Sequence, residues 1–419
     1  MTEIHGTCKP AFEPVREVFA ANFEERDEVG AALCVYQHGE PVLDIWGGIA
    51  RIDDETPWQR DTICLMDSST KTITAICAFM LIEAGELDLD KPVAHYWPEF
   101  AAQGKGEIPV RLLFTHQLGM PALDRWLTLD DIEAWTPVVD AIAAQRLFWE
   151  PGTAHGYHGL TLGWLIGELV RRISGLTPGA FLRERIAPRL GKLDMWIGLP
   201  EELEPRVAHT IRADWGESML NVDSGHEKYD EFLREITALY VDPVFLDQYL
   251  NPDKRTDAIF KPDSGYTIAH RAFGPVEIGG DADGRREHAI ETPAVNGIAD
   301  ARSIARIYAS LMGEVDGVRL IGDELLEEAT RCHADGPDEL VKIRTRWGLA
   351  FALPGSEFFP PSAAPRSFGH PGANGALAYA DRETGIALGY LRNHQLTAFP
   401  DPHVDPLVAA VNSCARVAG

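Results

Sequence analysis

A strongly apolar run occupies residues 72–82, directly after the polar tetrapeptide Ser68-Ser69-Thr70-Lys71. Apolar side chains would cover nearly the whole circumference of a helix formed by this run, which is typical of a buried helix. Gly85 follows the run and predicts the C-terminal end of that helix. The pattern therefore places a lysine in the first turn of a buried helix.

Strand patterns occur near both ends of the chain. Residues 28–48 contain two apolar stretches joined by a turn at His38-Gly39, which predicts a β-hairpin. Towards the other end, strands are predicted at 347–353, 373–380 and 386–391, with a turn at 381–385 between the last two. Strands at both ends with helices between them favour an α+β fold, in which both termini contribute to one antiparallel sheet.

Helical patterns fill most of the chain between these strands. Helices are predicted at 110–116, 160–173, from Thr177-Pro178 onward, at 299–312 and at 406–417. Residues 212–291 are irregular, acidic and rich in aromatic side chains, so this insertion is either a partly ordered surface excursion or a lid that shapes a pocket. We expect an α/β region from residues 1–90 and 292–419, and a mainly helical region at 91–291 that places the insertion over the functional site.

Charge and composition exclude some classes of partner and location. The 419 residues carry a formal net charge of −26, which argues against binding to nucleic acid or to an anionic membrane surface. No apolar run is long enough to span a bilayer, and residues 1–6 lack the features of a signal peptide. The six cysteines are scattered without C-x-x-C pairs, and Cys34 and Cys77 lie in apolar runs. We therefore expect a cytoplasmic protein with reduced cysteines.

The tetrapeptide that begins the buried helix can carry chemistry. Residues three apart on a helix lie on one face, so Ser68 and Lys71 can touch. A serine hydroxyl becomes a useful nucleophile when a nearby base takes its proton. Burial and the positive end of the helix dipole both disfavour a charged lysine at this position. Taken alone, however, S-x-x-K also fits a helix N-cap followed by a solvent-facing lysine.

Two further segments carry candidate functional residues. Residues 149–161 place Tyr157 in a glycine-rich loop just before a predicted helix, and residues 368–375 place His370 and Gly372 among small residues beside an outer strand. His155 and His158 form an H-x-x-H pair, but no further ligand cluster supports a zinc site. The absence of G-x-S-x-G gives no support to an α/β-hydrolase.

Together, these segments resemble a known set of motifs. The ordered elements S-x-x-K, Y-x-x and H-x-G are similar to the active-site motifs of the serine β-lactamase and penicillin-binding-protein superfamily, in its class C-like branch. The segment 113–121, Leu-Phe-Thr-His-Gln-Leu-Gly-Met-Pro, also matches the family's pattern. Residues 157–164 and 369–373 resemble the family VIII carboxylesterases in particular. The resemblance implies a β-lactamase/transpeptidase-like fold.

The same resemblance implies a role for each residue. Ser68 would attack an acyl carbonyl, and Lys71 and Tyr157 would share the proton as general base and then general acid. The backbone N–H groups of Ser68 and Ala373 would form the oxyanion hole. The mechanism requires no metal and no cofactor.

Two departures from the family's pattern bear on the substrate. The β-lactamases of the family have Asn where this chain has Gly159, and a lysine where it has His370, which is mostly neutral at pH 7. Both changes weaken the polar anchoring of an anionic β-lactam, whereas an uncharged ester loses less. The resemblance places His370, Gly372 and Gly159 beside the substrate, and Trp347 belongs either to the core or to the pocket wall.

The leading hypothesis is a serine carboxylesterase that acts on small short-chain or aryl esters, with weak β-lactam hydrolysis. A D-aminopeptidase, amidase, lactonase or acyltransferase of the same superfamily is an alternative. A non-catalytic binding protein with this fold is an alternative from another class, although an intact Ser68, Lys71 and Tyr157 set argues against it. Neither the natural ester nor the oligomeric state follows from the sequence.

Overall fold

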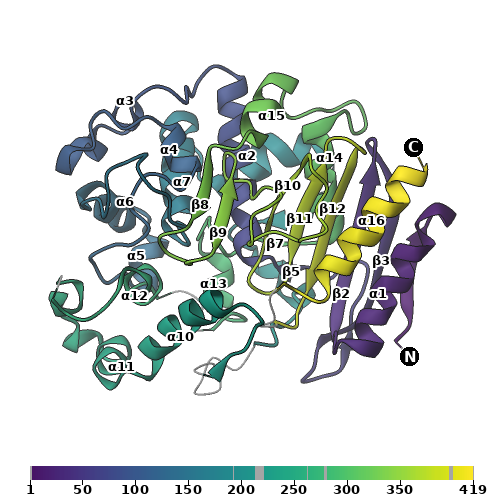
Figure 1. The fold of residues 1–419 in the computed structure, drawn as a ribbon, viewed down its shortest axis with the longest axis horizontal. Coiled ribbons are helices and arrows are strands. Elements are labelled where there is room, and N and C mark those ends of the chain that lie inside the picture. The colour runs from purple at the N-terminus through teal and green to yellow at the C-terminus, as the bar shows by residue number, and fades with distance from the viewer. Residues whose placement is uncertain are drawn as a thin grey trace.

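Strands from both ends of the chain form the central sheet (Figure 1). The structure is a computed structural model that describes residues 2–191, 193–212, 221–261, 263–277, 281–395 and 400–418. All pairings in the sheet are antiparallel, in the order β1-β3-β2-β12-β11-β10, and β4 pairs with β3. The strands are β1 (Ile4–Cys8), β2 (Gly30–Gln37), β3 (Glu40–Arg51), β4 (Thr56–Pro57), β10 (Ser367–Pro371), β11 (Leu377–Asp381) and β12 (Ile386–Arg392). The predicted α+β fold with a sheet built from both termini is confirmed.

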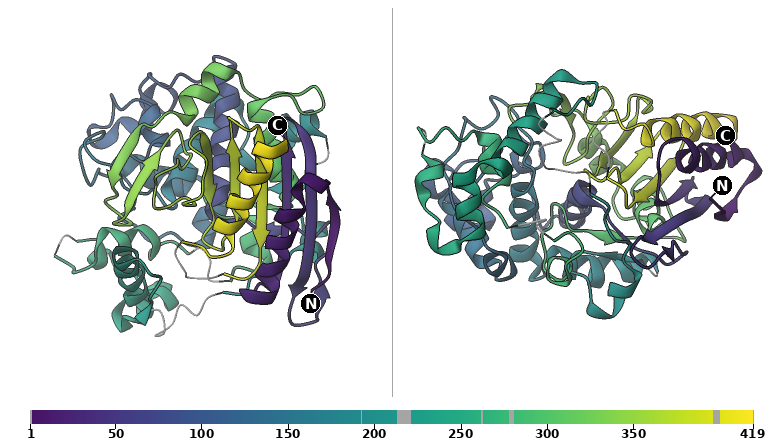
Figure 2. Two further views of the ribbon diagram at one scale, coloured as in Figure 1. Left: turned by 45° about the vertical axis from the view of Figure 1, so that its right-hand side comes forward. Right: turned by 90° about the horizontal axis from the view of Figure 1, so that it is seen from below.

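Strand β2 shows why the sheet is sandwiched between two helical layers. Its side chains alternate between two hydrophobic cores, one on each face of the sheet, because successive residues of a strand point to opposite faces. Ala32, Cys34 and Tyr36 join the core that contains α2 (Thr70–Glu83) and α14 (Ala301–Met312). The residues between them join the core of α1 (Glu13–Glu25) and α16 (Val404–Ala418), which lie together over the opposite face (Figure 2).

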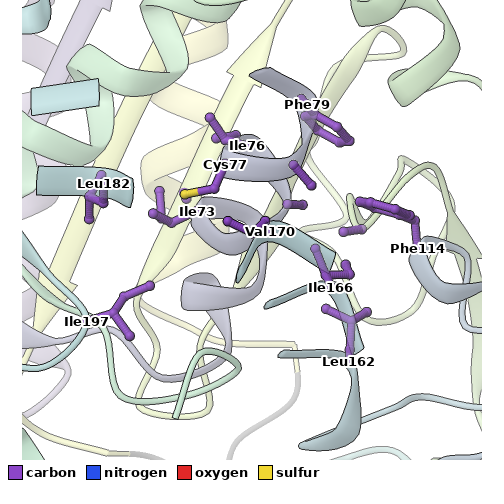
Figure 3. Packing of buried hydrophobic residues seen from close by; sticks show 14 of the residues in the cluster. Ile73, Ile76, Cys77, Phe79, Phe114, Leu162, Ile166, Val170, Leu182 and Ile197 are labelled. Atoms are coloured by element: carbon purple, nitrogen blue, oxygen red, sulfur yellow. The ribbon is translucent and has the colours of Figure 1, made fainter. Parts of the chain in front are cut away.

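Helix α2 lies at the centre of the larger core. Every residue from Thr70 to Phe79 is buried, and the helix packs against α7 (Thr161–Ser174). Ile73, Ile76 and Phe79 belong to the same hydrophobic cluster as Leu162, Ile166 and Val170 of α7 (Figure 3). The predicted end of the helix is also observed, because Gly85 takes a left-handed φ of 72° directly after the last turn.

Most of the remaining helices belong to residues 91–291. Along the chain, six short α-helices of the described ranges follow α2 and precede the insertion: α3 (Val93–Tyr96), α4 (Arg111–Phe114), α5 (Leu129–Glu133), α6 (Thr136–Ala144), α8 (Pro178–Phe181) and α9 (Ala187–Leu190). The described parts of the insertion are helical: α10 (Glu227–Val241), α11 (Pro243–Leu250), α12 (Ile268–Phe273) and α13 (Arg285–Ala289). Helix α15 (Asp323–Thr330) follows α14. In Figure 1, α10, α11 and α12 gather beside α5 and the hairpin of β8 (Ala334–Pro337) and β9 (Arg344–Trp347).

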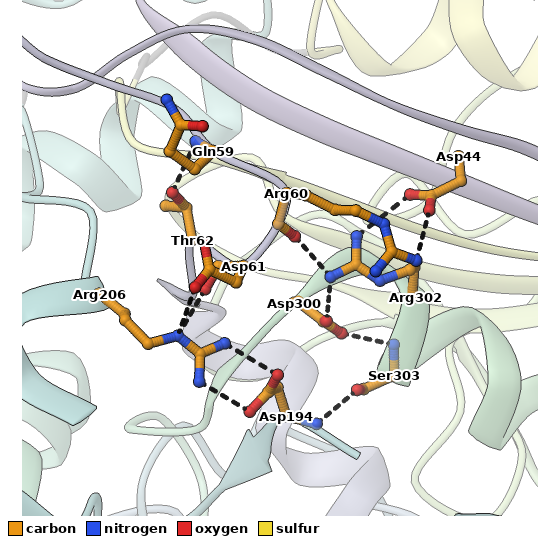
Figure 4. A network of polar contacts seen from close by, with 10 residues as sticks. All are labelled: Asp44, Gln59, Arg60, Asp61, Thr62, Asp194, Arg206, Asp300, Arg302 and Ser303. Atoms are coloured by element: carbon orange, nitrogen blue, oxygen red, sulfur yellow. Dashed lines mark hydrogen bonds and ion pairs between the residues drawn. The ribbon is translucent and has the colours of Figure 1, made fainter. Parts of the chain in front are cut away.

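Two small sheets complete the fold. Strand β7 (Ile298–Ala299) pairs with both β5 (Cys64–Leu65) and β6 (Met195–Trp196), and β8 (Ala334–Pro337) pairs with β9 (Arg344–Trp347). A polar network fixes the start of α14 near the first of these sheets (Figure 4). Asp300 accepts the N–H of Ser303 at 2.7 Å as the helix N-cap, and Arg302 pairs with Asp44 of β3 at 3.2 Å.

Two predicted strand boundaries are wrong. The apolar segment 347–353 was expected to be a strand, but the observed strand β9 ends at Trp347. Beyond it the chain turns, because Gly348 donates to the carbonyl of Phe351 at 2.8 Å and Ala350 donates to that of Phe114 at 2.7 Å. The strand predicted from residue 373 begins only at Leu377 in β11, since residues 372–376 form a turn closed by Gly372 N–H and the Ala376 carbonyl at 2.7 Å.

The sequence also predicts reduced cysteines and no apolar run that is long enough to span a bilayer. All six cysteines lie in described residues without a disulfide, and Cys34 and Cys77 are buried. Among the helices of the described ranges, none is both long enough and apolar enough to cross a bilayer.

Replacing Ile76 by alanine is expected to lower the free energy of unfolding by about 2–5 kcal/mol, because the fully buried side chain would leave a cavity in the core. Urea unfolding measures this loss. The control Val417→Ala alters a side chain that is 86% exposed and is expected to change stability by no more than about 0.5 kcal/mol. A loss below about 1 kcal/mol for Ile76→Ala would contradict the central position of α2.

Candidate active site

Ser68 and Lys71 lie side by side at the start of α2. Ser68 is part of a 3-10 turn, Asp67–Ser69, that leads directly into the helix. The Lys71 Nζ atom is 2.9 Å from Ser68 Oγ and donates to the carbonyl oxygen of Ala294 at 3.1 Å. Ser68 is half-buried, whereas Lys71 behind it is fully buried. The nucleophile candidate is therefore reachable from outside, and its amine neighbour is shielded from water.

The buried position of Lys71 changes its protonation. Burial lowers the pKa of Lys71 from its usual value near 10.5 to about 7, although the Asp67 carboxylate opposes the shift. Burial also raises the pKa of Asp67 to about 6, while the N–H of Asn374 and the Lys71 charge lower it. A substantial fraction of Lys71 is therefore neutral near pH 7, and a neutral amine can accept a proton from Ser68.

Three threonines fix the first turns of α2 against its neighbours. Thr70 Oγ1 accepts the N–H of Gly297 at 2.8 Å and donates to the carbonyl of Asp67 at 2.6 Å. Thr74 Oγ1 donates to the Pro293 carbonyl at 2.6 Å. Thr72 accepts a hydrogen bond from Tyr308 of α14 at 2.7 Å. The segment that supplies the Ala294 carbonyl to Lys71 is thereby held along the helix.

Tyr157 lies over Lys71, in the loop that precedes α7. Its ring centroid is 4.9 Å from Lys71 Nζ, and its ring stacks on the indole of Trp347 at 5.7 Å with an angle of 13°. Burial raises the pKa of the Tyr157 phenol, an effect that the adjacent Ser68 side chain partly offsets. The hydroxyl is buried without a hydrogen-bond partner of normal geometry in the described ranges. Tyr157 is therefore a protonated phenol at neutral pH, next to Ser68 and Lys71.

A buried carboxylate holds the backbone of Tyr157 in place. Asp338 Oδ1 accepts the N–H of Tyr157 at 3.0 Å, and Oδ2 accepts the hydroxyl of Thr345 at 3.1 Å. Thr345 Oγ1 in turn accepts the indole N–H of Trp347 at 2.9 Å. Trp347 is fully buried, so it belongs to the core and supports Tyr157 from behind.

The third motif lies on β10, at the edge of the sheet. Ser69 Oγ donates to the carbonyl of His370 at 2.8 Å, which joins the strand to the Ser68 turn. The His370 Nδ1–H donates to the Pro371 carbonyl at 2.6 Å, while Nε2 is buried without a partner in the described ranges. Burial, followed by the nearby Lys71 charge, lowers the pKa of His370 to about 3. The imidazole is therefore neutral, and the site has no fixed cation at this position.

The loop after β10 brings Ala373 beside Ser68. Asn374 donates its N–H to Asp67 Oδ2 at 2.7 Å, so the residues that precede Ser68 and follow Ala373 are in contact. Gly372 lies against the Met66 carbonyl, where an added Cβ would be 2.6 Å from the oxygen. The backbone hydrogen bonds of the described residues use neither the Ser68 N–H nor the Ala373 N–H. Within the described ranges, neither donor is therefore committed to the backbone.

Gly159 is covered by the insertion. A Cβ at this position would lie 2.6 Å from Cε1 of Phe273, at the end of α12. Phe273 packs with the hydrophobic cluster that contains Tyr157, as do Tyr229 and Phe358. The described part of residues 212–291 therefore packs against Gly159 through Phe273, and its role as a lid stays a prediction. Residues 213–220, 262 and 278–280 of this insertion lie outside the described residues.

Three of the histidines near Tyr157 make structural contacts. His158 donates from Nδ1 to the Gly156 carbonyl at 2.7 Å and accepts the Met120 N–H at Nε2 at 3.2 Å. His116 accepts the N–H of His158 at 3.0 Å, and His155 bonds to Thr345 at 2.9 Å. Within the described ranges, no group of three or more His, Cys, Asp or Glu side chains is arranged to hold a metal ion.

Sequence reasoning missed several residues that shape the site. Asp338 and Thr345 belong to none of the sequence motifs, and their contacts with Tyr157 and Trp347 depend on a turn that brings distant segments together. Phe273 belongs to an insertion whose periodicity is poor. Asp67 offered a usable signal, because a carboxylate directly precedes the candidate nucleophile in the sequence.

Comparison with known proteins decides the family. A family model described as Beta-lactamase matches residues 15–413 of the chain. The chain belongs to the β-lactamase family. The esterase/β-lactamase LipL of Mycobacterium tuberculosis is 30% identical over 403 residues, which cover 94% of this chain and 84% of LipL.

Solved structures of the family agree with the fold. A family VIII carboxylesterase is 32% identical with a TM-score of 0.77, covering 98% of this chain and 100% of that chain. A penicillin-binding-protein homologue from Caulobacter crescentus is 30% identical with a TM-score of 0.78, at the same coverage. The resemblance drawn from the three motifs and the β-lactamase/transpeptidase-like fold are confirmed. The chain is a hydrolase of the serine β-lactamase fold.

Gly159→Ala is expected to lower the free energy of unfolding by about 1–3 kcal/mol, because its Cβ would collide with the Phe273 ring. In a Phe273→Ala background the same substitution is expected to cost less, since the ring is gone. A double-mutant cycle followed by urea unfolding measures this coupling.

Gly313→Ala serves as the matched control for that cycle. A Cβ at Gly313 meets nothing within 4 Å, so this variant is expected to behave identically with and without Phe273. Strict additivity of Gly159→Ala and Phe273→Ala would show that the insertion does not cover Gly159.

Proposed function

We propose that the protein is a serine carboxylesterase that acts through an acyl-enzyme on Ser68. One observation carries the proposal: a fully buried Lys71 amine lies 2.9 Å from the hydroxyl of a half-buried Ser68. A lysine is able to act as a base at neutral pH when burial lowers its pKa, and here that pKa is about 7. Nucleophile and base are thus assembled before a substrate arrives.

In the first step Ser68 Oγ attacks the carbonyl carbon of the ester. Its proton passes to the neutral Lys71 amine, and the carbonyl π-electrons move onto the oxygen. The Ala294 carbonyl accepts one Lys71 N–H, which orients the amine lone pair towards Ser68. The N–H groups of Ser68 and Ala373, which make no backbone hydrogen bond among the described residues, donate to the oxyanion of the tetrahedral intermediate.

The intermediate then collapses and the alcohol leaves. The bond between the carbonyl carbon and the alkoxy oxygen breaks, and the leaving oxygen receives a proton from Lys71 through the phenol of Tyr157. The protonated state of Tyr157 supports a relay role, with Lys71 as the base. Water next attacks the acyl-enzyme, its proton follows the same route back to Ser68 Oγ, and the carboxylic acid is released.

The surroundings of Ser68 favour small uncharged esters. The His370 imidazole is neutral, and the partly buried rings of Phe273, Phe358 and Tyr229 pack with the cluster around Tyr157. An anionic β-lactam finds no fixed cation on β10, so we propose that its turnover is weak. LipL is named an esterase/β-lactamase and EstB of Burkholderia gladioli an esterase, which supports this assignment. A panel of amides, lactones and acyl acceptors separates the other activities found on this fold.

Ser68→Ala is expected to lower the turnover of p-nitrophenyl butyrate by at least about 10⁴-fold, because the nucleophile is removed. A fluorophosphonate should leave a mass adduct on the wild-type peptide that contains Ser68 and none on the variant. The control Ser174→Ala changes a serine at the end of α7 and should keep both the turnover and the adduct. Turnover that survives Ser68→Ala would refute the mechanism, and a wild-type chain that forms no adduct with any acyl donor would favour a non-catalytic binding protein.

The rate constant kcat/KM is expected to fall as the pH drops below about 7, because protonation of Lys71 removes the base. The sign follows from the form required: neutral Lys71 predominates above its pKa and the ammonium below it. Asp67 titrates nearby at about 6, so the acid limb should be a composite of the two groups. A pH–rate profile with an uncharged ester measures the limb, and a rate that is flat from pH 8 to pH 5 would exclude Lys71 as the base.

A further inference from the structure

The loop at residues 372–375, called here the oxyanion loop, is held on two sides by groups that the reaction itself does not use. Asp67 Oδ2 accepts the N–H of Asn374 at 2.7 Å, and Arg392 Nε donates to the carbonyl of Asn374 at 2.8 Å. Both peptide groups of Asn374 are thereby fixed. The residue next to it, Ala373, supplies one of the two N–H groups proposed for the oxyanion.

The side chain of Asn374 completes the anchoring. Its Nδ2 donates to the Leu65 carbonyl at 2.7 Å, and its Oδ1 accepts the N–H of Ala376 at 3.1 Å. Asn374 is 1% exposed, so each of these hydrogen bonds replaces water that the buried groups have lost. The oxyanion loop therefore cannot shift without breaking several buried hydrogen bonds.

Arg392 is itself held rigidly. It is the last residue of β12 and is fully buried, with its guanidinium bonded to both carboxylate oxygens of Asp401 at 3.2 and 2.6 Å. Asp401 also accepts the N–H of Val404 at 3.2 Å, which ties the pair to the start of α16. Gly375 has a φ of 85°, and any Cβ there would collide with the guanidinium. A bidentate arginine pair of this kind has a fixed geometry that lysine does not reproduce.

We propose that Asp67 and the Arg392–Asp401 pair are positioning residues that set the distance between the Ala373 N–H and Ser68 Oγ. The inference rests on the proposed function. An oxyanion donor is effective only when it is already in place for the charge that develops in the transition state. Asp67 is well suited to this role, because it directly precedes Ser68 and its carboxylate accepts the N–H of Asn374 in the oxyanion loop.

Phenylboronic acid tests the proposal directly, because its adduct with Ser68 places an oxygen where the oxyanion forms. In Asp67→Ala and Arg392→Lys, kcat should fall by about 10- to 100-fold with KM nearly unchanged, less than the 10²–10³ that follows loss of a whole donor. The affinity for the boronate should fall by the same factor. Asp67→Asn retains an acceptor for the Asn374 N–H and should be about tenfold faster than Asp67→Ala.

The pH profile of Asp67→Asn provides an independent readout. The charge of Asp67 interacts electrostatically with groups on the elements around it, among them Lys71, Arg212, Cys64 and Tyr157. Removing this negative charge destabilises the Lys71 ammonium, so the acid limb should move to lower pH. An acid limb that stays in place would contradict the proposed closeness of Asp67 to the base.

Arg206→Lys is the matched control, because Arg206 also makes a bidentate pair, with Asp194, but does not contact the oxyanion loop (Figure 4). It should leave boronate affinity unchanged. The proposal is overturned if Asp67→Ala and Arg392→Lys bind the boronate within twofold of wild type, or if they lose rate without losing boronate affinity. A wild-type chain that binds the boronate at Ser68 but hydrolyses no ester would instead refute the proposed function. The boronate affinities of the variants would then still test whether Asp67 and Arg392 position the oxyanion loop.

Discussion

The buried amine of Lys71 is the constraint around which the site is organised. An ammonium placed in an apolar core costs several kcal/mol, and the group lowers that cost by becoming neutral. Helix α2 is buried from Thr70 to Phe79, so its first turns leave no solvent-facing position for the Lys71 side chain. The same burial that would destabilise a charged lysine makes it a base at neutral pH. The proposed catalytic role of Lys71 therefore depends on where the sequence places an apolar helix.

The rest of the fold delivers partners to that amine from distant parts of the chain. The segment before β7 supplies the Ala294 carbonyl, and the loop before α7 supplies Tyr157. The edge strand β10 supplies His370, whose pKa is lowered by burial and then by the nearby Lys71 charge. The sheet is built from both termini, so β10 and the oxyanion loop are fixed only when β2 and β12 have paired. The site is thus a product of the complete fold, since no single segment carries its geometry.

Part of this arrangement was predictable from the sequence, because local chemistry determines it. The apolar run after Lys71, the hairpin at 28–48 and the three ordered motifs each carry their own signal, and the comparisons confirm the family. The prediction of a strand at 347–353 was wrong because a buried apolar run can form a turn as readily as a strand. The hydrogen bonds by which Asp338 holds Tyr157 and Arg392 holds Asn374 could not be predicted, since they join residues that are not neighbours in the sequence. The domain boundaries, the cytoplasmic location and the role of each site residue stay predictions.

An NMR titration of protein carrying ¹³C-labelled lysine, with the Lys71 signal assigned by its absence in Lys71→Met, tests this buried base most directly. We expect Lys71 to titrate with a pKa of about 7, below exposed lysines, which titrate near 10.4. Lys105, whose pKa burial lowers to about 8, provides an internal comparison, because it lies far along the chain from the catalytic motifs. A Lys71 that remains charged up to pH 9 would contradict its role as the base.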